Sequence, residues 1–84
     1  MAYSIIFNTD VAHVPPAVLA ELRRSLGDIG DSISSIPQTS VFWVSIDNSL
    51  FELTISGWLF SYLIDRRRDE LVVVSVQRAE RKTG

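Results

Sequence analysis

Side chains along the second half of the chain follow a period of two, which is typical of β-strands. Residues 51–55 alternate apolar with polar, residues 40–46 and 58–64 form two alternating sets of mostly apolar side chains, and residues 71–76 form a valine-rich run. The connections between them are short and carry turn-forming Asp, Asn, Ser and Gly residues. Because tight turns join neighbouring antiparallel strands, the pattern predicts a four-stranded meander without crossover connections.

The first half of the chain predicts one short strand and one helix. Residues 3–7 are β-branched and aromatic and are followed by a polar stop, which favours a strand. Pro15 and Pro16 lie where a helix would begin, because a first helical turn leaves its N–H groups unpaired and suits proline. An apolar stripe follows at helical spacing, formed by Val18, Leu19, Leu22 and Leu26. Gly27 then predicts the end of this helix.

Residues 28–36 leave two structures open. Ile29, Ile33 and Ile36 recur at helical spacing, and Asp28 or Asp31 could cap a second short helix that ends before Pro37. The glycine and the serines in this segment equally suit a loop with buried isoleucines. The chain therefore predicts one or two helices before the meander.

In sum, the pattern predicts an α+β fold of the order β-α-(α)-β-β-β-β, with a four- to five-stranded antiparallel sheet packed on the N-terminal helices. The last two strands are apolar on both faces, so one face remains too apolar for water after helices cover the other. Either a partner covers that face or the sheet curls around its own core. For the partner, we expect contact through Trp43, Leu59, Leu63, Val72 and Val74.

Composition sets the scale of the molecule. With 84 residues, 46% of them hydrophobic and 21% charged, the chain is expected to form a single globular domain over residues 1–84 with a thin core. It has no cysteine, which excludes disulfides and thiolate metal sites, and its other residues show no metal or cofactor motif. The N-terminal residues lack the features of a secretory signal, and no apolar run is long enough to span a membrane. We therefore expect a cytoplasmic protein that binds no cofactor and no membrane.

The net charge is −2, and its two signs are unevenly distributed along the chain. Residues 1–60 carry two arginines against six acidic side chains, whereas residues 61–84 carry six basic side chains against four acidic ones. The late positive charge lies in the turn at 66–68 and in the C-terminal segment at Arg78, Arg81 and Lys82. The negative net charge argues against nucleic-acid binding by bulk electrostatics, and the positive potential is confined to these two late segments.

Three segments resemble the RelE/ParE superfamily of bacterial toxins from type II toxin–antitoxin modules. They are the opening residues 3–12, residues 53–58 around Gly57, and the closing hairpin formed by residues 60–65 and 69–78. The strand–helix–meander layout is also similar, with the first strand able to pair inside the sheet. The resemblance covers about two thirds of the chain.

This resemblance implies a toxin that arrests growth when it is free, in a fully active or an attenuated form. Such toxins cleave mRNA on the ribosome or inhibit DNA gyrase, and an antitoxin packed along the sheet and helices neutralises them. The resemblance assigns activity to the end of the last strand, and so to Arg78, Arg81 and Lys82. The nuclease branch usually has an arginine three residues before the tyrosine that corresponds to Tyr62, and this chain has Leu59 there.

An alternative function remains open alongside the toxin. The chain could be a non-catalytic interaction module that keeps the toxin-like fold and forms a homodimer through the second face of its sheet. His13 and the three arginines at 66–68 fit a polar loop and a solvated turn better than a catalytic role. Under either function, the main partner is a protein: an antitoxin, gyrase, the ribosome with its mRNA, or a second copy.

Overall fold

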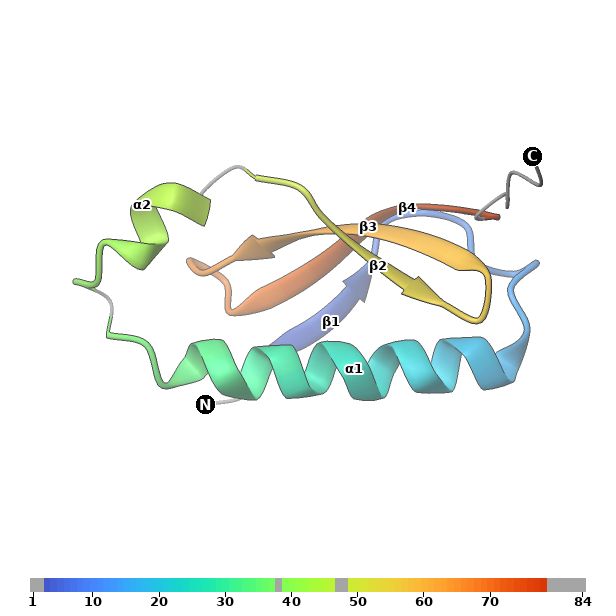
Figure 1. The fold of residues 1–84 in the computed structure, drawn as a ribbon, viewed down its shortest axis with the longest axis horizontal. Coiled ribbons are helices and arrows are strands. Elements are labelled where there is room, and N and C mark those ends of the chain that lie inside the picture. The colour runs from blue at the N-terminus through green and yellow to red at the C-terminus, as the bar shows by residue number, and fades with distance from the viewer. Residues whose placement is uncertain (1–2, 38, 47–48, 79–84) are drawn as a thin grey trace, which may run out of the picture.

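One long helix lies beneath one face of a four-stranded sheet (Figure 1). The computed structural model describes residues 3–37, 39–46 and 49–78. Within them the elements follow the order β1 (Ser4–Phe7), α1 (Pro16–Ser34), α2 (Phe42–Ile46), β2 (Phe51–Ile55), β3 (Trp58–Asp65) and β4 (Glu70–Arg78). The α+β class is confirmed, with the sheet packed on helix α1.

Helix α1 begins as the sequence predicts and ends later. Pro15 is its N-cap and Pro16 its first residue, and Val18, Leu22 and Leu26 are buried. The helix continues through Gly27, because the next turns still present apolar or small residues to the sheet. The expectation that Gly27 ends the helix is therefore wrong, and residues 28–34 extend α1 instead of forming a second helix or a loop.

Gly30 lets α1 approach the sheet closely. A Cβ atom at this position would lie 3.1 Å from Cβ of Tyr3 and 3.7 Å from Cδ1 of Leu71. At Gly27 a Cβ atom would meet nothing within 4 Å. The two glycines of α1 therefore differ: a side chain at Gly30 would press against Tyr3, and one at Gly27 would enter open space.

The sheet has the order β1-β4-β3-β2 and is mixed rather than purely antiparallel. Strands β2, β3 and β4 form an antiparallel meander, and β1 lies parallel to β4, with Ser4 opposite Glu70. Strand β1 is thus at an edge of the sheet and not in its interior. The sheet remains open, with β1 and β2 at its two edges, so it does not curl into a closed core.

A bulge interrupts the pairing of β3 with β4. Ser61 lies opposite Ser75, but the next residue, Tyr62, lies opposite Val73, so Val74 is the extra residue. A bulge shifts the alternation of all later side chains by one position. As a consequence Val76 shares a face with Phe60, whereas uninterrupted alternation would place it with Val72 and Val74.

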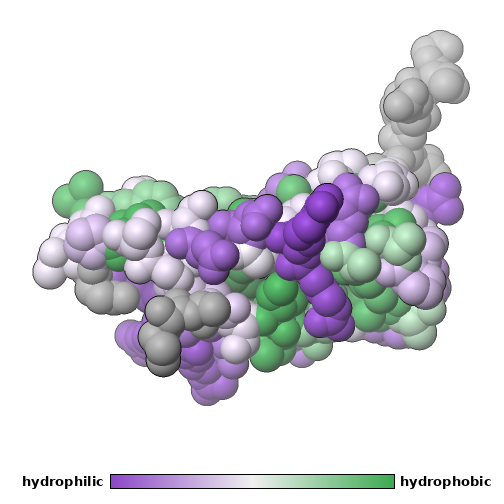
Figure 2. Space-filling model, turned by 90° about the horizontal axis from the view of Figure 1, so that it is seen from below, coloured by the Kyte–Doolittle hydropathy of each residue, from purple (hydrophilic) through white to green (hydrophobic). Residues whose placement is uncertain are grey.

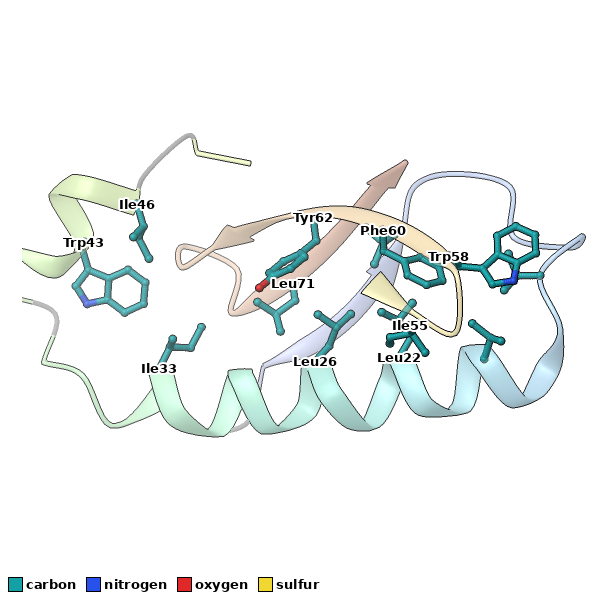
Figure 3. Close-up of a cluster of buried hydrophobic side chains, with 13 residues drawn as sticks. Leu22, Leu26, Ile33, Trp43, Ile46, Ile55, Trp58, Phe60, Tyr62 and Leu71 are labelled. Atoms are coloured by element: carbon teal, nitrogen blue, oxygen red, sulfur yellow. The ribbon is translucent and has the colours of Figure 1, made fainter. Parts of the chain in front are cut away.

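The core lies between α1 and the sheet (Figure 3). Leu22 and Leu26 of α1 face Phe60, Leu71 and Val73 of the sheet, and none of these five side chains is measurably exposed. Tyr62, Ile55 and Trp58 point to the same side and are also buried (Figure 3). One face of the sheet is therefore closed by a single helix.

Residues 42–46 form the short helix α2, where the alternating pattern predicts a strand. The hydroxyl of Ser40 accepts a hydrogen bond from the N–H of Phe42, as an N-cap side chain does. Trp43 and Ile46, three residues apart, are buried, and Nε1 of Trp43 donates a hydrogen bond to the carbonyl of Pro37. The sheet consequently has three meander strands after the helices and not four.

Candidate protein-binding face

The face of the sheet opposite α1 carries an apolar row that runs across three strands. Ile6 of β1 pairs with Val72 of β4, and Val72 pairs with Leu63 of β3. We call these three residues the apolar row. Ile6 is 38% exposed, and Val72 and Leu63 are partly exposed. Neither of the two described helices covers this face (Figure 1), so its apolar side chains meet solvent.

Charged residues of one sign border the apolar row. Asp65 lies two residues after Leu63 in β3 and pairs with Glu70 of β4 on the same face. On the other side of the row, Ser61 pairs with Glu52 of β2. Among the residues that the structure describes, strand pairing places no lysine or arginine on this face. Strand pairing therefore borders the apolar row with carboxylates, and the turn between Asp65 and Glu70 adds the three arginines at 66–68 at one end of this border, where the Asp65 carboxylate accepts hydrogen bonds from two N–H groups of the turn.

The expected partner-binding residues divide into two groups. Leu59, Leu63 and Val72 lie on the open face and are partly exposed, as the sequence predicts. Val74 is partly exposed, but it is the extra residue of the bulge, so alternation assigns it to neither face. Trp43 is only 1% exposed and lies in the core of the α2 end, so it does not belong to this surface.

Apolar side chains are also exposed around α2. Val41 is 82% exposed and Val44 is 78% exposed, and Leu50, the residue before β2, is 62% exposed. Seen from the α1 side, apolar residues show at several places along the molecule, the α2 end among them, with hydrophilic residues between them (Figure 2). On the inner side of α2, the guanidinium of Arg66 lies 5.3 Å from the ring centre of Trp43.

Arg78, the first of the expected catalytic cations, lies on the α1 side of the sheet. Its guanidinium lies 5.1 Å from the ring centre of Trp58, and the ring of His13 lies 5.5 Å from the same indole. The bulge produces this arrangement, because it returns Arg78 to the face of its pairing partner Trp58. Arg81 and Lys82 lie outside the described residues.

Two further side chains that could take part in RNA cleavage, those of Tyr62 and Glu52, do not lie beside Arg78. Tyr62 faces α1 and is 7% exposed, and burial raises the pKa of its hydroxyl above the usual value. Glu52 lies on the open face, whereas Arg78 lies on the α1 side. Of the groups that metal-free cleavage requires, the described residues bring one cation, Arg78, and one imidazole that could serve as a base, His13, to the same indole.

No cluster of His, Asp and Glu side chains that could hold a metal ion occurs among the residues described. Within the same part of the chain, the helices are too short or too polar to cross a membrane. Compared with protein-family models, curated proteins and solved structures, the chain matches none of them.

Proposed function

We propose that this domain works by binding another protein through the open face of its sheet, as the toxin of a toxin–antitoxin pair. The observation that carries the proposal is the uncovered apolar row. A sheet face in contact with water normally carries polar side chains, and a contiguous apolar surface marks a site of interaction. Within the toxin class, a binding mode such as gyrase inhibition fits this surface better than RNA cleavage.

The layout of the chain supports the toxin part of the proposal. The similarity to the RelE/ParE superfamily rests on a strand, a helical segment and a C-terminal meander, and the observed elements follow this order. Cytoplasmic residence follows from the same proposal, since such toxins act on targets inside the cell.

The arrangement of charge supports binding over catalysis. RNA carries one phosphate for each nucleotide, and strand pairing gives the open face the carboxylates of Glu52, Asp65 and Glu70 but no cation to bind a phosphate. The one described cation among the expected catalytic residues, Arg78, lies on the other side of the sheet, against Trp58. Contact with a protein needs neither a general base nor a cation on the open face.

Expression in a bacterial host tests this function. Induction of the wild-type chain should arrest growth, and Leu63→Glu should restore growth at an equal amount of folded protein, because it places a charge in the middle of the apolar row. Arg78→Ala is the matched variant outside the row and should leave the arrest unchanged. Normal growth with abundant, folded wild-type protein would remove the toxin proposal. Restoration of growth by Arg78→Ala alone would instead favour a reaction at the C-terminal cations.

One observation favours the second candidate, a homodimeric interaction module. The α2 end exposes Val41 and Val44 at a site separate from the apolar row, and a second copy could cover them. Light scattering of the purified chain decides this point. A stable dimer that becomes a monomer in Val41→Ser/Val44→Ser, together with normal growth on induction, would support the module and contradict the toxin.

A further inference from the structure

We infer that the partner of the open face is a basic amphipathic helix, with lysines or arginines on both sides of its apolar stripe. The inference concerns the chemistry of the partner, and it rests on the proposal that the open face binds a protein. The resemblance to toxins does not specify this chemistry. It follows from which side chains the strand pairing brings to the face.

The first argument is the position of the carboxylates. Along β3, Leu63 of the apolar row lies between Asp65 on one side and Ser61 on the other, and Ser61 pairs with Glu52. Glu70 lies beside Asp65. Alternate residues of a strand are about 7 Å apart, so carboxylates border the row on both sides at a distance that a lysine side chain spans.

Across the strands, the row is about as long as a helix is wide. Its three residues lie on three adjacent strands, and neighbouring strands are about 4.8 Å apart, so the row spans about 10 Å between its outer strands. The apolar stripe of one helix, whose full diameter with side chains is about 10–12 Å, covers a surface of this size. The face therefore suits one helix rather than a broad sheet or a whole domain.

The third argument excludes the other occupants. A second copy docked face to face would oppose Glu52, Asp65 and Glu70 with the same carboxylates, and like charges brought together in an interface repel each other. A nucleic-acid backbone or an acidic segment meets the same repulsion. Cations on an apolar helix are attracted to the border while its stripe covers the row.

A pair of designed peptides tests the inference by calorimetry. One is a helix of about 18 residues with a leucine stripe and lysines elsewhere, and its match carries glutamates in place of the lysines. The lysine peptide should bind the wild-type domain more weakly as salt rises, and the glutamate peptide should not bind. Resonances of Leu63 and Val72 should shift in the NMR spectrum of the complex, and those of the outer face of α1 should not.

Two double variants with the same change in net charge separate a local effect from a general one. Glu52→Lys/Glu70→Lys should weaken binding of the lysine peptide about tenfold or more. Glu21→Lys/Asp28→Lys, at exposed positions of α1, should retain most of the affinity. Glu52→Lys alone, at an exposed position, provides the weaker test if the double variant does not fold.

Each result decides the inference. Equal loss of affinity in both double variants, binding of the glutamate peptide, or no binding of either peptide would overturn it. The result is also distinguishable from the fate of the toxin proposal. If growth arrest depends on Leu63 but the lysine peptide does not bind, the function stands and the inferred partner is wrong. If the lysine peptide binds at the row but the chain does not arrest growth, the inferred partner stands and the toxin proposal is wrong.

Discussion

Phe60 and Leu59 are neighbours in β3, yet they lie on opposite faces of the sheet and in different surroundings. Phe60 is fully buried against α1, whereas Leu59 is partly exposed on the face that no helix covers. The comparison shows that α1 buries one apolar face of the sheet and leaves the other partly exposed to solvent. The α1 side therefore contributes most of the buried apolar surface that stabilises the fold.

The largest expected effect comes from truncating the covered side. Phe60→Ala should lower the free energy of unfolding by about 3–5 kcal/mol, because it removes buried apolar surface and leaves a cavity. Leu59→Ala is the matched change on the open side and should cost about 1 kcal/mol or less. Urea unfolding followed by circular dichroism measures both. Equal losses would show that the open face contributes to the core, and the comparison would fail.

A smaller effect tests how closely α1 approaches the sheet. Gly30→Leu should destabilise the domain by about 1–3 kcal/mol, because its side chain would overlap Tyr3 and Leu71. Gly27→Leu is the control in the same helix, and helix propensity should make it neutral or stabilising by up to about 1 kcal/mol. If both variants unfold at the same urea concentration, the contact between Gly30 and the sheet is not as close as described.

The smallest effect appears only in alkaline solution. Burial raises the pKa of Tyr62 above its ordinary value of 10.0, so the folded state favours the neutral hydroxyl. Its contribution to stability is complete below about pH 10, the unfolded pKa, and is lost as the pH rises through the folded pKa. Unfolding in urea at pH 9 and pH 11 should therefore show a smaller loss of stability for Tyr62→Phe than for the wild type. Tyr3 shares the direction of this shift and remains in both proteins.

The meander was the part of the fold that could be predicted best. In β2, polar and apolar residues alternate over the whole strand, and in β3 the buried residues Trp58, Phe60 and Tyr62 recur at every second position. Gly57 occupies a turn position with a φ of 83° that favours glycine. The apolar stripe of α1 likewise predicted the buried Val18, Leu22 and Leu26. In these elements a single period repeats for long enough to dominate local preferences.

Three features could not be predicted from local pattern alone. Gly27 lies inside α1 because tertiary packing of the following apolar residues outweighs a helix-propensity cost of about 1 kcal/mol. The alternation in residues 42–46 matched a strand, while Ser40 and the three-residue spacing of Trp43 and Ile46 matched the helix that forms. The bulge at Val74 has no signal in the sequence.

Part of the candidate site could be predicted, because strand alternation shows which residues share a face. Alternation correctly placed Leu59, Leu63 and Val72 on one face. Leu59 and Leu63 lie on β3, which has no extra residue, and Val72 precedes the extra residue of β4, so the bulge does not change their alternation. Ile6 was missed, since the edge position of β1 depends on pairing between distant parts of the chain. The acidic border was also missed, because it becomes apparent only when the strands are set side by side.

The pairing of β1 with β4 joins the first strand of the chain to the last. A ribosome must synthesise almost the whole chain before Ser4 can meet Glu70, and contacts so distant in sequence form slowly. During synthesis, Ile5 and Phe7 therefore remain without β4 beside them. The part of α1 that packs on β1 also lacks its contacts with β4 until that strand has been made. A chaperone or a binding partner present at that moment would encounter an incomplete domain, and the finished surface would arise only after β4 has been synthesised.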